Sequence, residues 1–348
     1  MHKKLIVVCR QLDQETPQPA QRFSWEQFLV WVDKQRQLAE EVVSCYEAGC
    51  FGYWPHRQLE QKGVRNYVVR PRSWDEYHQK VKTDQRDAKE LVLALSRYVE
   101  GNRSALSVVR VPTEAQEQRR SLSRQRQSLH QERQRLAAKG RSHGCYYGLR
   151  HSLLGAWWSP SHWEKLLPEL SPILLELLEP LRQLIEAVEK ALQASTRALE
   201  KAAPAGLIKG LGNLSHENIE REVLDWERFR NRRQVSSYTG LCPSEDSSAQ
   251  RRFQGSINKH GNRRLRPLLI EASWRLLIHQ KQYRTIKKWS GLWSDSKVSK
   301  GRRKKMIVAI ARQFAVDLWR IKTGRTSPEK LGLEVWPLPA PVPAQAAA

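Results

Sequence analysis

The spacing of apolar residues in the first part of the chain alternates between two periods. Short β-branched runs at 5–9, 42–46 and 67–70 predict strands, and helical periodicity at 25–36 and 57–61 predicts helices between them. Strands and helices that alternate in this way build a sheet covered by helices. We therefore predict an α/β domain in this part of the chain.

Two long amphipathic helices are predicted next. Leucines recur every seven residues within 113–139, which gives a thin apolar seam on a basic helix, and a fuller apolar stripe runs through 173–199. The seam leucines are Leu122, Leu129 and Leu136. Because the segment 140–161 contains glycine and proline, we expect it to turn the chain back into an antiparallel hairpin.

This hairpin has two interpretations, an interface between protomers or an internal stalk. Three tryptophans beside its turn fit either interpretation, because aromatic side chains are enriched at interfaces and also pack well in cores. They are Trp157, Trp158 and Trp163.

The last third of the chain is predicted to be mainly helical. Helical patterns occupy 219–229, 262–279 and 307–321, and a stretch rich in proline and alanine follows. The overall class is therefore α/β plus α. The predicted parts are an α/β domain at 1–112, a helical hairpin at 113–203, a mainly helical domain at 204–323 and a disordered tail at 324–348.

The charge of the chain indicates a polyanionic partner. The 348 residues carry a formal net charge of +24, and residues 241–322 contain 20 Lys and Arg against 5 Asp and Glu. A surface of this kind attracts nucleic acid, and the binding should weaken steeply with salt because neutralised phosphates release counterions.

The cysteines and the apolar runs exclude other classes of protein. The five cysteines form no CxxC pair, which argues against a zinc finger and for free thiols in a reducing compartment. Apolar runs stay shorter than the roughly 18 residues that a membrane span requires. We expect a soluble, cytoplasmic protein without a membrane partner.

Hydroxyl groups and cations come together in the sequence between residues 240 and 266. The stretch 240–248 reads GLCPSEDSS, in which a glycine and a proline are predicted to hold a loop that exposes Ser247 or Ser248. The basic run 259–266 follows, and a cationic helix start can bind a phosphodiester. The alternative is an ordinary exposed serine pair that only hydrogen-bonds its own loop.

Carboxylates mark a second candidate site in the α/β domain. Glu47 comes just after the predicted strand 42–46, at a strand end where sites in open sheets gather. Asp84 and Asp87 are spaced to project from one face of a helix's first turn. The alternative for the two aspartates is plain N-capping.

Several separated sequence motifs in the C-terminal part resemble those of one protein family. GLCPSEDSS, GSINKHGNRRLR and LLIEASW are similar, in the same order, to the C-terminal domain of the insertion-sequence-110 family of bacterial transposases. The resemblance implies a serine nucleophile that forms a phosphoserine link with DNA. It aligns that nucleophile with Ser248, and a shift of one residue would select Ser247. The residues that we expect to bind nucleic acid are Arg251, Arg252, Lys259, Asn262, Arg263, Arg264, Arg266, Lys300, Arg302, Arg303, Lys304 and Lys305.

The N-terminal part resembles the same family's RuvC-like domain, of the ribonuclease H class, in YEAG at 46–49 and KTD to DA at 82–88. The resemblance implies a DEDD set of carboxylates that holds Mg²⁺, with Glu47, Asp84 and Asp87 as its second, third and fourth acids. The family's first aspartate would align just before Met1. We therefore expect a truncated N-terminus and poor or absent activity.

The resemblance also implies further partners. Family members act on donor and target DNA with an element-encoded guide or bridge RNA, and a coiled coil supports a homo-oligomer, a dimer or a tetramer. Two other functions stay open at this point. One is a metal-dependent, resolvase-like nuclease that uses water, and the other is an inactive nucleic-acid-binding remnant.

Overall fold

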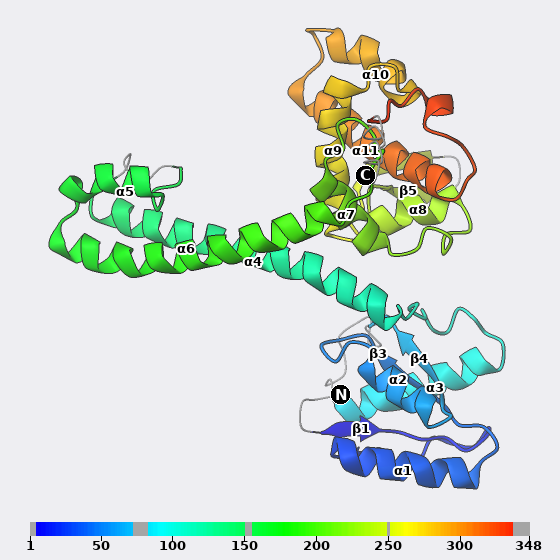
Figure 1. Ribbon diagram of the computed structural model, residues 1–348. Helices are drawn as coiled ribbons and strands as arrows, with labels where there is room; N and C mark the ends of the chain where they lie inside the picture. The colour runs from blue at the N-terminus through cyan, green and yellow to red at the C-terminus, as the bar shows by residue number, and fades with distance from the viewer. Residues whose placement is uncertain (1–4, 72–82, 150–154, 249–250, 337–348) are drawn as a thin grey trace, which may run out of the picture. The chain divides into compact units, whose positions relative to one another are not determined.

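The computed structural model describes residues 5–71, 83–149, 155–248 and 251–336 (Figure 1). The chain forms two compact units, Met1–Pro112 and Thr113–Ala348. Of the helices that the structure describes, none combines the length and the apolar character that a bilayer crossing requires.

The first unit contains two short strand pairs. β1 (Ile6–Val8) pairs antiparallel with β2 (Gln21–Phe23), and β3 (Val43–Glu47) pairs in parallel with β4 (Arg65–Val69). A parallel pair needs a crossover, and α2 (Trp54–Gln61) lies in the connection from β3 to β4. The predicted alternation of strands and helices is confirmed for this unit, whereas the short strand β2 was not predicted.

Two further helices complete this unit. α1 (Trp25–Leu38) begins at a capping box, in which the Ser24 hydroxyl accepts from the Gln27 amide and the Gln27 side chain accepts from the Ser24 amide. α3 (Asp84–Val99) is capped by the Thr83 hydroxyl. α1 packs against β1 through Phe28, Val32 and Ile6, and α3 packs against β4 through Ala94, Leu95 and Val69.

The second unit begins with a long helical hairpin. α4 (Glu114–Tyr146) and α6 (Pro172–Lys201) lie side by side (Figure 1). Arg126 donates to Thr196 and Arg133 to Glu189, so the contacts run backward along α6 as they advance along α4. The two helices are therefore antiparallel.

The turn of this hairpin begins later than the sequence predicted. Residues 140–146 continue α4, because Gly140 leaves room for the fully buried ring of Trp157, whose Nε1 donates to the Ala137 carbonyl at 3.1 Å. Trp158 and Trp163, on or near the short helix α5 (Pro160–Leu166), are also buried. The three tryptophans therefore pack the closed end of the hairpin.

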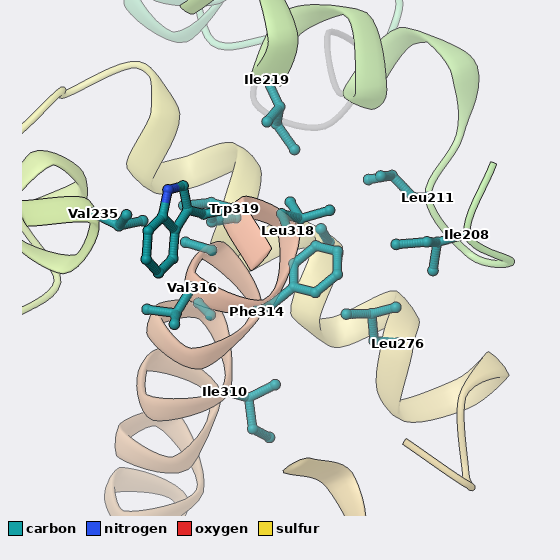
Figure 2. Packing of buried hydrophobic residues seen from close by; sticks show 14 of the residues in the cluster. Ile208, Leu211, Ile219, Val235, Leu276, Ile310, Phe314, Val316, Leu318 and Trp319 are labelled. Carbon is teal, nitrogen blue, oxygen red and sulfur yellow. The ribbon is translucent and has the colours of Figure 1, made fainter. Parts of the chain in front are cut away.

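Five helices form the core of the C-terminal part. They are α7 (Asn213–Val223), α8 (Arg232–Thr239), α9 (Leu265–His279), α10 (Arg284–Ser294) and α11 (Lys300–Lys322). α11 is central, and its buried Ile310, Phe314 and Leu318 lie among apolar side chains from several other segments (Figure 2). Leu276 of α9 and Ile219 of α7 belong to the same cluster.

Two predictions for this part are wrong. The predicted serine loop is a strand, β5 (Pro243–Ser248), which pairs antiparallel with β6 (Arg251–Ile257). The predicted tail is ordered at 324–336, where Leu331 and Leu333 are buried and the Trp336 amide donates to the Leu207 carbonyl at 2.8 Å. The rest of the predicted tail, at 337–348, lies outside the described residues.

Candidate catalytic and nucleic-acid-binding sites

The three predicted acids lie on two elements of the first unit. Glu47 is the last residue of β3, and Asp84 and Asp87 lie in the first turn of α3. The Thr83 hydroxyl accepts from the Arg86 amide, so threonine provides the cap that the alternative interpretation gave to an aspartate. Both aspartates lie in the first turn, where the helix dipole stabilises a carboxylate, so the structural alternative stays open.

Glu47 lies close to a buried thiol. Burial, with a smaller effect of the Glu47 charge, raises the pKa of Cys45 to about 12. The Cys45 sulfur lies 4.0 Å from the carbonyl oxygen of Leu91 in α3. Side chains two apart on a strand share a face, so Glu47 projects from the face of β3 that meets α3.

The structure does not gather the three acids into a metal site. Across residues 5–71, 83–149, 155–248 and 251–336, no group of three or more His, Cys, Asp or Glu residues is placed to hold a metal ion. The metal-binding assignment of Glu47, Asp84 and Asp87 therefore stays a prediction.

Ser248 lies at the end of the β5–β6 hairpin. It is exposed, and its directly opposed residue across the ladder is Arg251, which is also exposed. Opposed residues of an antiparallel pair share one face of the sheet. The register therefore places the Ser248 hydroxyl and the Arg251 guanidinium on one face of the hairpin.

Sequence reasoning missed a large aromatic side chain on the Ser248 face. Phe253 is opposite Asp246, two positions from Ser248 and Arg251 along their strands, and its side chain is 61% exposed. The alternation of residues in 251–257 would have revealed it had this segment been recognised as a strand.

The base of the hairpin is fixed by a close approach of two glycines. Gly240 ends α8 in the left-handed conformation at φ 66°, and a Cβ on it would lie 2.6 Å from the amide nitrogen of Gly261. The Asn258 amide donates to the Cys242 carbonyl at 2.8 Å, and the Lys259 amide donates to the Gly240 carbonyl at 3.2 Å. These contacts tie the start of the serine hairpin to the start of the basic run.

Several predicted phosphate ligands are held by the protein itself. The Asn262 side chain accepts from the amides of Arg264 and Leu265 and so caps the start of α9. The Arg264 Nε donates to Gln127 at 2.7 Å, and an Arg266 Nη donates to the Lys259 carbonyl at 2.6 Å. The predicted cations with exposed side chains are Arg251, Lys259, Arg263, Lys300, Arg302, Lys304 and Lys305. The side chain of Arg252 is outside the described set.

The basic start of α11 is the second predicted cationic region. Ser299 caps this helix by accepting from the Arg302 amide. Arg303 is half-buried, and its guanidinium donates to the Asp295 carbonyl at 3.1 Å. Four of the five cations in this region are therefore available to a polyanion, and Arg303 helps to shape the preceding loop.

Sequence reasoning also missed a buried carboxylate, Glu222, behind the basic run. Arg124 of α4 donates two hydrogen bonds to it at 3.0 and 3.1 Å, and Asn262 donates a third at 2.9 Å. Burial acts to raise the pKa of Glu222, but the hydrogen bonds from Arg124 and Asn262 and the charges of Arg124 and Arg120 outweigh it, so the pKa is lowered. Glu222 therefore links the hairpin helix to the residue that caps α9.

Two family models match separate parts of this chain. Residues 2–143 match the DEDD transposase model of the IS110 type, described as a transposase, and residues 207–311 match the model described as transposase IS116/IS110/IS902 family. A DEDD domain implies dependence on divalent metal in general.

Three curated relatives are also transposases by name. A putative transposase, y4rJ, of Sinorhizobium fredii is 30% identical over 309 residues, which cover 80% of this chain and 76% of the relative. A second from that organism, y4qE, is 28% identical over 243 residues, 68% of this chain and 58% of the relative. The transposase for insertion sequence element IS1111A of Coxiella burnetii is 34% identical over 116 residues, 33% of this chain and 31% of the relative. The chain therefore belongs to the IS116/IS110/IS902 family of transposases and is an enzyme that recombines DNA.

Proposed function

We propose that this transposase cuts and rejoins DNA through a covalent link between a DNA phosphate and Ser248. The observation that carries the proposal is the position of Ser248, exposed at the end of β5 and directly opposite Arg251. A guanidinium beside a hydroxyl favours binding of a phosphate at the same place, because it neutralises charge on the phosphate oxygens. Ser247 is the alternative nucleophile.

The proposed chemical step is an exchange of phosphate esters. The Ser248 Oγ forms a bond to phosphorus while the bond from phosphorus to a deoxyribose oxygen breaks. The serine hydroxyl releases its proton and the leaving oxygen takes one up. In rejoining, a deoxyribose hydroxyl attacks phosphorus and the serine oxygen leaves. Because the ester is conserved as phosphoserine, the exchange needs no nucleotide cofactor.

We include Mg²⁺ held by Glu47, Asp84 and Asp87 in the proposal. The donor set fits this ion, because three carboxylates supply the hard oxygen ligands that Mg²⁺ binds. The contact of the Cys45 sulfur with the Leu91 carbonyl shows that β3 and α3, the elements that carry the three acids, lie against each other. Binding of Mg²⁺ would have to draw the carboxylates together, because no three such residues among those described are placed to hold a metal ion. Bound Mg²⁺ would stabilise the charge that develops on the phosphate during exchange.

The proposal extends to the nucleic-acid partners and to assembly. The net charge of +24 supports binding of both donor and target DNA and a guide RNA that selects them by base pairing. We place the exposed cations beside the serine hairpin and at the start of α11 against the phosphate backbone. A homo-oligomer, a dimer or a tetramer, would bring carboxylates and serines from separate chains to one phosphate.

A covalent trapping assay tests the proposal. The full chain, extended at its N-terminus to carry the first aspartate that the family resemblance implies, is incubated with labelled DNA carrying the element's ends, the element's non-coding transcript and Mg²⁺. The products are separated under denaturing conditions. We expect a protein–DNA adduct that is absent in Ser248→Ala, retained in the matched Ser247→Ala and absent in EDTA. The reverse pattern for the two serines would move the nucleophile by one residue.

Two other outcomes would select the alternative functions. Cleavage that survives both serine substitutions but requires Asp84 and Asp87 would identify a metal-dependent nuclease that uses water. Metal-independent DNA binding without any strand breakage would identify a nucleic-acid-binding remnant.

A further inference from the structure

Helix α9 of the C-terminal part exposes two large apolar side chains on its solvent side. Trp274 of α9 is 42% exposed, and Ile278, one turn later, is 68% exposed. The Trp274 ring meets the ring of Trp293 from α10 at a centroid distance of 5.6 Å and an angle of 72°. The opposite side of α9 supplies Leu269 and Leu276 to the core. Trp274 and Ile278 are therefore left for a partner.

The chain segment that carries Trp293 is strongly basic. The segment 284–305, which contains α10 and the start of α11, has nine Lys and Arg against one acidic residue, Asp295. The Arg303 guanidinium lies 5.8 Å from the Trp293 ring centroid, and the Lys288 ammonium lies 5.9 Å from that of Trp289. A partner that covers this face must therefore bring both negative charge and flat apolar surface.

We propose that Trp274, Ile278 and Trp293 form a platform on which bases of an unpaired DNA strand stack, with the exposed lysines of α10 and of the start of α11 on its phosphates. Unpaired nucleotides satisfy both requirements, because each has an exposed aromatic face and a phosphate. In a duplex the base faces are covered by stacking, so a duplex presents only its sugar-phosphate backbone and groove edges to this platform. The platform lies on different elements from the serine hairpin and the carboxylates, and the proposal does not depend on the nucleophile.

Fluorescence anisotropy with the full chain tests the platform. The probes are a labelled oligothymidylate of about 15 nucleotides, a duplex of the same length and the corresponding oligouridylate. We expect Trp274→Ala to weaken binding of the DNA single strand by about 10- to 100-fold and duplex binding by less than about threefold. Trp274→Phe should recover most of the loss. The matched control is Trp336→Ala, which removes another tryptophan that is 53% exposed.

Four results would overturn the platform. Two of them concern Trp274→Ala, namely unchanged binding of the DNA single strand and an equal loss of binding for the single strand and the duplex. The third is binding of oligouridylate but not of oligothymidylate, which would indicate RNA as the occupant. The fourth is a change in oligomeric state without a change in DNA binding, which would indicate a second copy of the chain. Circular dichroism of each variant separates loss of the platform from loss of the fold. A covalent adduct that still forms on duplex ends in Trp274→Ala would separate this proposal from the serine mechanism.

Discussion

Replacing Arg124 by alanine removes one partner from the buried carboxylate behind the basic run. Arg124 donates two of the hydrogen bonds that Glu222 receives, and only 4% of the Glu222 side chain is exposed, against 40% of Arg124. After the change Glu222 keeps one hydrogen bond from Asn262. The carboxylate then stays buried with too few donors, which is the costly part of the substitution.

The expected cost follows from these exposures. Breaking a fully buried ion pair costs about 3–5 kcal/mol, and an exposed one costs less than about 1 kcal/mol. Because Arg124 is partly exposed, water can replace it at Glu222, and we expect about 2 kcal/mol. For the second compact unit, Thr113–Ala348, this loss should lower the Tm by about 4–8 °C.

Thermal unfolding of four proteins tests the pair. They are the wild type, Arg124→Ala, Glu222→Gln and the double variant. Glu222→Gln removes the buried charge and keeps an acceptor for Asn262, so Arg124→Ala should cost less than about 0.5 kcal/mol in its presence. Arg135→Ala is the control, because Arg135 is 67% exposed on the same helix and pairs only with exposed Glu132. The reasoning would be refuted if Arg124→Ala lowered the free energy of unfolding equally in the wild type and in the Glu222→Gln variant.

The same pair predicts a dependence on pH. The folded-state pKa of Glu222 is lowered below the unfolded value of about 4.3, so its contribution is complete well above that pH and is lost as the pH falls through the folded pKa. The difference in Tm between wild type and Arg124→Ala should therefore close below about pH 4. A difference that persists there would mean that Arg124 acts through packing alone.

Three further predictions concern single positions. Gly140→Ala should lower the free energy of unfolding by about 2 kcal/mol in chemical unfolding, because the new Cβ would lie 2.8 Å from Trp157 Cε2. The control is Gly291→Ala, which has open space around it and should raise the free energy of unfolding by up to about 1 kcal/mol. A gain in stability for Gly140→Ala would contradict the packing of Trp157 against Gly140. Tyr283→Phe should cost about 1–3 kcal/mol in urea unfolding, because the fully buried Asp317 loses a hydrogen bond of 2.6 Å, and a cost below about 0.5 kcal/mol would be inconsistent with that bond. Arg263→Ala should reduce the dependence of log K for DNA on log salt by about 0.9, as expected for one lost phosphate contact, and an unchanged slope would place Arg263 away from DNA.

The sequence predicted helices better than it predicted the serine hairpin. Helices such as α6 have long apolar stripes that define both type and extent, whereas β5 reads as a loop because it is polar on both faces. The start of the hairpin turn was misplaced because glycine usually breaks helices, and only the packing of Trp157 explains Gly140 inside α4.

The candidate sites were predicted where the signal was local. Short sequence motifs were enough to identify Ser248, Glu47 and the basic runs as candidates, although their grouping in space stays a prediction. Glu222 could not be found in this way, because an acid on an amphipathic helix looks solvated. Its partner Arg124 is 98 positions away in the sequence, and only the fold brings the two together.

The β5–β6 hairpin has a consequence for the timing of the reaction. Its described side chains from Ser244 to Ser256 are exposed, and Ile257 at its base packs against the core. A two-stranded ribbon without a covering layer is marginally stable in water. On the mechanism proposed above, the Ser248 hydroxyl would gain a fixed position only when DNA or another subunit closes over the hairpin, so that a lone protomer would not cut DNA before the recombining complex is complete.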